Sequence, residues 1–172
     1  MKKSKLILGL LLITIALAVY SIYPENRLTP GTEINKIVVL KAKRQMLVYS
    51  RGILLKSYQV SLGAESIGHK EFQGDKKTPE GIYYINDKNP NSGWHKNLGV
   101  SYPNKIDQLH AKKTGKSAGG DIKIHGMNKN TAFLGKFHRW FDWTLGCIAV
   151  TNEEIDELYQ AVKIGTPIEI KP

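Results

Sequence analysis

Cysteine is almost absent from this 172-residue sequence, which contains only Cys147. A single cysteine cannot close a disulfide within the chain, and it cannot supply the Cys-x-x-Cys half of a structural zinc site. The 5 histidines show no His-x-x-x-His spacing, and no acidic residues cluster beside them. We therefore predict a fold that forms without disulfides and a protein that uses no metal and no cofactor.

Acidic residues are also scarce, because 15 Asp and Glu stand against 25 Lys and Arg, giving a formal net charge of +10. Aromatic residues make up 9% of the chain, and no basic run is interleaved with them, which argues against a nucleic-acid partner. The charge is spread along the chain. It fits either a solubilising surface or polyanionic surroundings such as a cell-wall polymer or a membrane face.

Long apolar runs are missing except for the uncharged stretch Leu6–Tyr23, which follows Lys2, Lys3 and Lys5. Helical residues rise about 1.5 Å each, so a stretch of this length nearly crosses a bilayer core of about 30 Å. We predict that residues 1–23 are a cleaved signal peptide or a retained membrane anchor. The following chain then lies in the cell envelope, on the periplasmic or extracytoplasmic face of the cytoplasmic membrane.

The predicted export makes a functional role for the lone cysteine more plausible than composition alone does. Outside the cytoplasm an unpaired thiol tends to be oxidised unless the protein uses it. One alternative is that Cys147 is a small apolar residue of the core. The other is that it is a catalytic nucleophile, which its neighbours in the sequence must support.

The remaining chain is predicted to contain a linker, residues 24–33, and one domain, residues 34–171, which is long enough to bury its own core. Short runs rich in β-branched and aromatic residues predict a mainly β fold with hairpins and one or two helices. These runs are residues 33–40, 45–49, 53–62, 81–85, 121–125, 147–150 and 166–170. Residues 86–120 are rich in Asn, Gly, Lys, Ser and Pro and predict a long excursion with a short helix near 105–110.

One helix is marked at both ends. Thr151 and Glu154 have the spacing of a capping box, and Gly165 stops the apolar pattern that follows. Within it, Ile155, Leu158, Tyr159 and Val162 recur at helical spacing. This helix should pack on the sheet just after the strand that follows Cys147.

The chemistry is predicted to lie between Cys147 and His125, which precedes it by 22 positions. A free thiol has a pKa of about 8.5, so an adjacent imidazole would make it partly ionised near neutral pH and could later return the proton. The amides of Cys147 and Gly146 are candidates to stabilise an oxyanion. The carbonyl of Gly126 could fix the tautomer of His125, and Thr144 could contact the thiol.

The aromatic segment just before the cysteine, residues 138–143, allows two interpretations. It could line a substrate cleft, with Arg139 contacting the substrate. Alternatively its aromatic side chains simply pack together and Arg139 is exposed. The segment 74–81, rich in Asp, Pro and Gly, is most simply a structural hairpin connection.

Four motifs in order resemble those of the YkuD-type L,D-transpeptidase catalytic domain, from about Ile34 to Ile170. They are Gly74-Asp-Lys-Lys-Thr-Pro-Glu-Gly-Ile-Tyr83, Ile122-Lys-Ile-His-Gly126, Thr144-Leu-Gly-Cys-Ile148 and Val162-Lys-Ile-Gly-Thr-Pro-Ile-Glu-Ile170. The resemblance implies a mixed β-sheet sandwich or barrel. It also implies a cysteine enzyme that remodels peptidoglycan, with Cys147 as nucleophile and His125 as general base.

In that family the thiolate attacks the carbonyl before the terminal D-alanine of a stem peptide, and the acyl group passes to an amine. The implied partners are peptidoglycan stem peptides and an amine acceptor, either a stem-peptide diamino acid or a protein lysine. The membrane is a further partner, through the N-terminal segment.

Two positions depart from the family's common pattern. Leu145 stands where that pattern has His, and Ala149 stands where it has Arg or Asn. The variant is similar to the YafK-like branch, so hydrolysis of peptidoglycan-attached amides by a cysteine amidase or peptidase is an alternative to transfer. A second alternative is an inert wall-binding module, against which the intact His125 and Cys147 argue.

Overall fold

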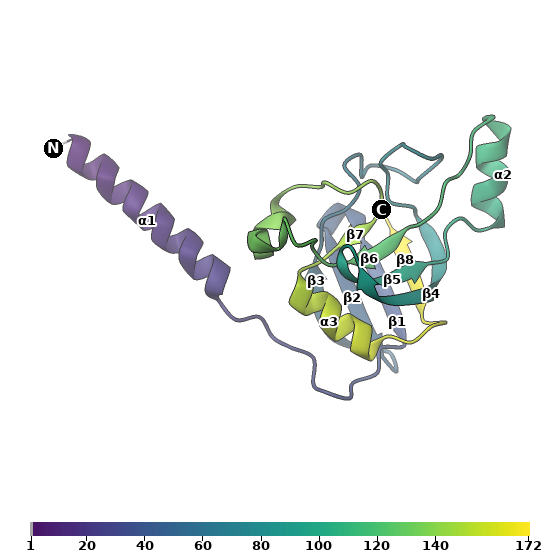
Figure 1. The fold of residues 1–172 in the computed structure, drawn as a ribbon, viewed down its shortest axis with the longest axis horizontal. Helices are drawn as coiled ribbons and strands as arrows, with labels where there is room; N and C mark the ends of the chain where they lie inside the picture. Colours follow the sequence, from purple (N-terminus) through teal and green to yellow (C-terminus); the bar gives the residue numbers. More distant parts are fainter. Residues whose placement is uncertain (1) are drawn as a thin grey trace.

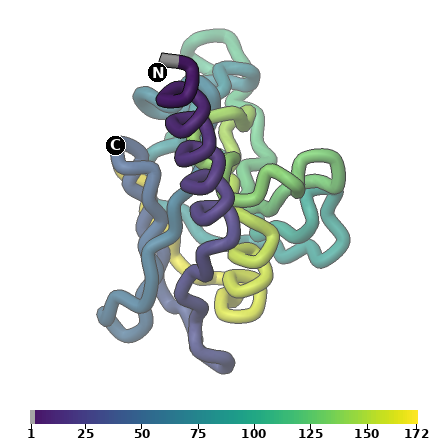
Figure 2. Tube along the Cα trace, turned by 90° about the vertical axis from the view of Figure 1, so that its left-hand side faces the viewer, coloured from purple at the N-terminus to yellow at the C-terminus, as the bar shows by residue number. Residues whose placement is uncertain are grey.

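The computed structural model describes residues 2–172, so Met1 of the predicted signal or anchor lies outside the described residues. The first element, α1 (Lys2–Ile22), is a long helix that an extended linker separates from the remaining chain (Figure 1). Residues 3–22 of α1 are apolar and long enough to cross a membrane, and none of their candidate span is buried in protein. In Figure 2, turned by 90°, α1 lies in front of the domain, from which it projects in Figure 1.

The domain is built on one eight-stranded mixed sheet with the order β3-β2-β1-β8-β4-β5-β6-β7. The pairs β1–β8 and β6–β7 are parallel, and the other neighbours are antiparallel. The predicted mainly β fold with mixed strand directions is confirmed. The strands are β1 (Lys36–Leu40), β2 (Gln45–Ser50), β3 (Ile53–Gln59), β4 (Gly81–Ser92), β5 (His95–Val100), β6 (Lys123–His125), β7 (Ile148–Ala149) and β8 (Pro167–Lys171).

Strand β4 joins the two halves of the sheet. Its first residues, from Gly81 to Tyr84, pair with β8, whereas its later residues pair with β5. The register shifts between Ile85 and Asp87, and such irregularities bend a strand. The sheet therefore curves, and its far edge, β6 and β7, carries His125 and leads out of the turn at Cys147.

The prediction for residues 86–120 was wrong in its first part. Residues 86–100 form most of a hairpin between β4 and β5 instead of an irregular excursion. The sequence pattern hid these strands because β4 is largely exposed after Ile85, so its residues are polar. The predicted short helix is present as α2 (Lys105–Lys113), with Asn104 and Asp107 in a capping box.

Helix α3 (Asn152–Ala161) covers the sheet, and its capping box between Thr151 and Glu154 is present as predicted. Ile155 and Leu158 are fully buried in the apolar core that α3 shares with the strands. The remaining helices are short 3₁₀ segments, η1 (Lys41–Lys43) and η2 (Ala132–Trp140). Because α3 starts five residues after Cys147, its packing fixes the chain that leaves the turn.

A buried lysine ties the loop before β4 to the end of β1. The Lys41 side chain is 3% exposed, and its ammonium donates to Glu80 Oε1 at 2.8 Å. It also donates to the carbonyls of Gly68 at 2.6 Å and Thr78 at 2.9 Å. Three oxygens thus surround a charge removed from water, which is the condition under which a buried charge is tolerated.

We expect Lys41→Ala to lower the free energy of unfolding by about 3 kcal/mol or more, because it leaves a carboxylate and two carbonyls without their donor. Lys43→Ala, at an exposed position in the same 3₁₀ turn, should change it by less than about 0.5 kcal/mol. Urea unfolding followed by circular dichroism measures both. Equal stabilities of the two variants would contradict this role of Lys41.

Candidate active site

The turn that presents Cys147 is held by the hydroxyl of Thr144. Thr144 Oγ1 accepts a hydrogen bond from the Gly146 N–H at 3.1 Å and donates to the Cys147 carbonyl at 2.7 Å. Thr144 is buried, so these bonds are shielded from water. In this conformation the Gly146 amide is already used, which leaves the Cys147 amide as the candidate oxyanion donor.

Glycine is required beside the cysteine because backbone from another loop lies against it. Gly146 has a φ of +131°, and a Cβ there would lie 2.7 Å from the Lys77 carbonyl oxygen. A Cβ on Gly63 would lie 2.1 Å from the Lys76 carbonyl oxygen. The Thr78 hydroxyl accepts from the Gly63 amide at 2.9 Å. The Gly74–Gly81 segment therefore packs against the turn that carries Cys147, in addition to connecting strands.

His125 ends β6, and its ring is oriented by the next residue. His125 Nδ1 lies 2.7 Å from the Gly126 carbonyl oxygen, as the sequence analysis anticipated. A carbonyl only accepts, so Nδ1 carries the hydrogen and the unprotonated nitrogen of the neutral ring is Nε2. Gly126 also has no room for a side chain, since a Cβ would lie 2.5 Å from Asn152 Oδ1.

The parallel pairing of β6 with β7 brings histidine and cysteine to one cavity. His125 pairs with Ala149, two residues after Cys147. A pocket of about 250 Å³ contains both residues. Its lining is Ser92, Trp94, Asn97, Asp121, Lys123, His125, Trp143, Thr144, Leu145 and Cys147.

Two tryptophans flank the histidine. The Trp94 ring centroid lies 5.0 Å from that of His125, and the Trp143 centroid lies 5.8 Å from it. Trp94 was not predicted as a site residue, because it sits in the turn of the β4–β5 hairpin, which the sequence pattern hid. Asn97 was missed for the same reason, although its register opposite His125 places it at the pocket.

Burial keeps the resting pair neutral. It lowers the pKa of the His125 imidazole, against the opposing effect of the Gly126 carbonyl, and it raises the pKa of the Cys147 thiol. The Cys147 S–H donates to the Asp121 carbonyl at 3.6 Å. Burial thus favours the uncharged thiol and the uncharged imidazole in this structure, whereas the sequence suggested a partly ionised thiol at neutral pH.

Residues 34–170 match the family model of the L,D-transpeptidase catalytic domain, YkuD. The chain belongs to this family. It is 29% identical over 177 residues to the Escherichia coli K12 protein named "Putative L,D-transpeptidase YafK", a match that covers 94% of this chain and 64% of YafK. The chain thus spans less than two thirds of that relative.

Three solved structures share the fold of this chain. The helical cell shape determining protein Pgp2 of Campylobacter jejuni is 25% identical with a TM-score of 0.59, covering 82% of this chain and 48% of Pgp2. Bd1075 of Bdellovibrio bacteriovorus is 25% identical with a TM-score of 0.55, covering 83% and 49%. An L,D-transpeptidase of Mycobacterium smegmatis is 16% identical with a TM-score of 0.53. The match covers 83% of this chain and 60% of that protein, and it supports the fold alone.

Arg139 does not contact the pocket of this L,D-transpeptidase-family domain, and the prediction that it contacts substrate is corrected. Its side chain is 8% exposed and pairs with Glu25 at 2.6 Å and with Glu154 at 2.7 Å. The alternative that Arg139 is exposed is also wrong. A buried guanidinium needs carboxylate partners, and the linker and α3 supply them.

His138 lies behind the pocket. Ser61 Oγ donates to the His138 carbonyl at 2.7 Å and lies 3.0 Å from Nδ1. Burial, with the nearby Arg139 charge, lowers the pKa of His138 to about 4. His138 is therefore neutral at physiological pH and packs edge-on against Trp143, with centroids 6.5 Å apart.

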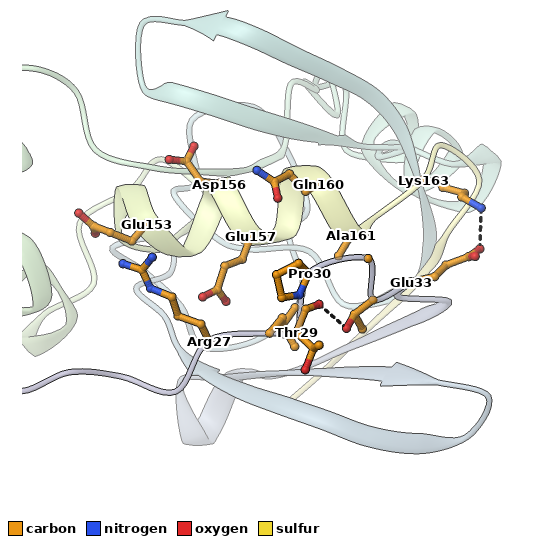
Figure 3. Close-up of a pocket in the computed structure, with 13 residues that line it drawn as sticks. Arg27, Thr29, Pro30, Glu33, Glu153, Asp156, Glu157, Gln160, Ala161 and Lys163 are labelled. Atoms are coloured by element: carbon orange, nitrogen blue, oxygen red, sulfur yellow. Dashed lines mark hydrogen bonds and ion pairs between the residues drawn. The ribbon is translucent and has the colours of Figure 1, made fainter.

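A larger hollow of about 610 Å³ lies elsewhere, between the linker and α3 (Figure 3). Arg27, Thr29 and Pro30 face Glu153 and Glu157 across it. Its other charges include Glu33 and Lys163, which pair at 2.9 Å. The hollow contains neither Cys147 nor His125, so the chemistry of the family is not placed there.

The pH dependence of alkylation tests the neutral resting pair. We expect iodoacetamide to add once, at Cys147, with an apparent pKa higher in the folded chain than in the urea-unfolded chain, because burial raises the thiol pKa. Below the unfolded pKa both forms are mostly thiol. The difference between the alkylation rates of the unfolded and the folded chain should therefore be largest at a pH between the two pKa values. Intact mass against time at several pH values measures this, and a lower apparent pKa in the folded chain would contradict it.

His125→Gln should keep the fold but lower turnover of muropeptides by roughly 100-fold or more, because general-base catalysis contributes about 10² to 10⁴. His138→Gln is the matched control. It should reduce stability more than turnover per folded molecule, since His138 packs behind the pocket. Chromatographic product assays and thermal unfolding of both variants measure this, and equal losses of turnover would show that the base is wrongly assigned.

Proposed function

We propose that this chain is a peptidoglycan L,D-transpeptidase that works through a Cys147–His125 acyl-enzyme on stem peptides. The observation that carries the proposal is the shared pocket, in which Gly126 fixes the His125 tautomer beside the only thiol. Membership of the L,D-transpeptidase family supports the reaction class. The name of Pgp2 as a cell shape determining protein supports a role in the cell wall.

The first half of the reaction forms the thioester. As sulfur attacks the carbonyl before the terminal D-alanine, His125 Nε2 takes the thiol proton. This step suits a neutral resting pair because charge develops only when substrate fills the pocket. The Cys147 N–H stabilises the oxyanion. The imidazolium then protonates the leaving amine, and D-alanine departs.

The second half transfers the acyl group. An acceptor amine, from a stem-peptide diamino acid or a protein lysine, loses a proton to His125 as it attacks the thioester, and the Cys147 thiol is restored. Lys123 lies at the pocket and pairs with the exposed Asp121 at 2.8 Å. We assign Lys123 to a substrate carboxylate, because it is the cation among the described residues that line the pocket.

Hydrolysis is the second candidate function, and the exposure of Leu145 favours it. This side chain is 75% exposed at the pocket, where the common family pattern has a histidine. An apolar group cannot orient an amine or carboxylate by hydrogen bonding, so water competes for the thioester. Ala149 does not add to this effect, because it is fully buried in the pairing with Ser61.

We further propose that α1 keeps the domain at the outer face of the cytoplasmic membrane. Its length and composition support this, since residues 3–22 suffice to span a bilayer. The lysines at the start of α1, Lys2, Lys3 and Lys5, support a cytoplasmic N-terminus.

The partition between transfer and hydrolysis is measurable. With tetrapeptide muropeptides and excess diamine, we expect wild-type protein to give a substantial share of hydrolysed product and Leu145→His to shift the ratio toward transfer. Leu145→Ala controls for loss of leucine without gain of imidazole. Mass spectrometry of the products gives the ratio. Exclusive transfer by the wild type would rule out the role given to Leu145. A folded wild-type protein with unoxidised Cys147 that gives neither product would rule out the enzyme assignment.

A further inference from the structure

The segment η2 exposes aromatic side chains that the catalytic site does not use. We define the η2 patch as Phe133, Phe137, Trp140 and Phe141. Phe133 is 82% exposed, Trp140 61% and Phe141 56%. The Phe137 and Trp140 rings pack together with centroids 5.0 Å apart, and three exposed large aromatic groups within nine residues make this segment a candidate contact surface. The neighbouring Lys129 is also exposed.

The η2 patch lies against the end of α1. The Tyr20 ring centroid is 5.4 Å from that of Phe137 and 6.0 Å from that of Trp140. The Lys136 ammonium donates to the carbonyls of Tyr20 and Tyr23. A cation at the C-terminal end of a helix also complements the helix dipole.

The following linker is fixed on the same side. Arg139 of η2 forms two hydrogen bonds to the Glu25 carboxylate, at 2.6 Å and 3.1 Å. These bonds and the adjacent charges lower the pKa of Glu25 to about 2, so the pair is ionised at physiological pH. The end of α1, its linker and η2 are therefore held together by direct contacts. If α1 lies in a membrane, all three lie at about the same depth.

We infer that the η2 patch is a second membrane contact, which seats in the interfacial layer of the bilayer that α1 spans. This inference rests on the proposed anchoring by α1. If the apolar helix lies in lipid, its last turn at Tyr20 lies near the headgroups, and the docked patch must lie there too. Tryptophan with exposed phenylalanines and flanking lysines is the composition that favours this layer, particularly when the lipids are anionic.

The contact has a consequence for the enzyme. Phe141 is six residues from Cys147, so the patch and the cysteine turn are joined by a short segment. The Arg139–Glu25 pair already limits rotation of the domain about its linker, and a lipid contact at the η2 patch limits it further, so that the pocket keeps one orientation. The domain would then act on peptidoglycan strands next to the membrane.

Site-directed spin labelling of the full chain in phosphatidylethanolamine–phosphatidylglycerol vesicles tests the inference. In a Cys147→Ala background, one nitroxide is placed at Leu12→Cys, Phe133→Cys or Ile106→Cys. Leu12 reports insertion of α1. Ile106, on α2 and 75% exposed, is the matched control, because α2 lies on the opposite side of the domain from α1 (Figure 1). Relaxation by oxygen and by a water-soluble nickel chelate measures lipid and water exposure.

We expect the label at 133 to show an oxygen-to-nickel ratio several-fold above that at 106, with the label at 12 higher still. A label at 12 in lipid with a label at 133 as nickel-accessible as that at 106 would overturn the patch and leave the anchor intact. Protection at 133 from both reagents would overturn it in favour of a protein contact. A water-exposed label at 12 would overturn anchor and patch together, without bearing on the Cys147 chemistry.

Discussion

The close approach of three backbone segments is the constraint on which the site depends. The loop at residues 76–78 lies against Gly63 and Gly146 so tightly that neither glycine has space for a Cβ. Thr144 and Thr78 then use their hydroxyls to hold the flanking amides. The cysteine is thus placed by main-chain packing, and Lys41 holds the far end of the same loop through three oxygens. A change in any of these segments moves the nucleophile relative to His125.

Burial explains both the protection and the reactivity of the cysteine. The same apolar surroundings raise the pKa of Cys147 and lower that of His125, so neither group is charged at rest. A protonated thiol is a poor target for oxidants, which matters for a lone cysteine in the location outside the cytoplasm that we propose. In the proposed reaction the thiol proton moves to His125 only when substrate is bound. The fixed tautomer of His125 leaves Nε2 free to accept that proton. Among residues 2–172 no carboxylate bonds to the His125 ring, which is consistent with this arrangement because Gly126 supplies the orienting acceptor.

The residues around Arg139 show how position in sequence can mislead. Arg139 lies eight positions before the nucleophile, which suggested contact with substrate, yet it turns away and joins the linker to α3 through Glu25 and Glu154. Trp143, from the same segment, does line the pocket. The direction of each side chain depends on the 3₁₀ geometry of η2, which has no apolar period in the sequence long enough to reveal it. One short segment therefore lines the candidate active-site pocket at one end and carries the proposed membrane contact at the other.

The sequence by itself determined the family, most of the strands, α2 and α3, and it singled out Cys147 and His125 as the candidate catalytic pair. Local signals sufficed for these, since capping boxes, β-branched runs and a unique cysteine are properties of short segments. Tertiary structure alone decided that residues 86–100 form a hairpin, that Trp94 and Asn97 reach the pocket, and that the Gly146 amide is already bonded. It also decided the ionisation of the pair. Each of these depends on contacts between residues far apart in the chain, and on how much water those contacts exclude, which no local pattern encodes.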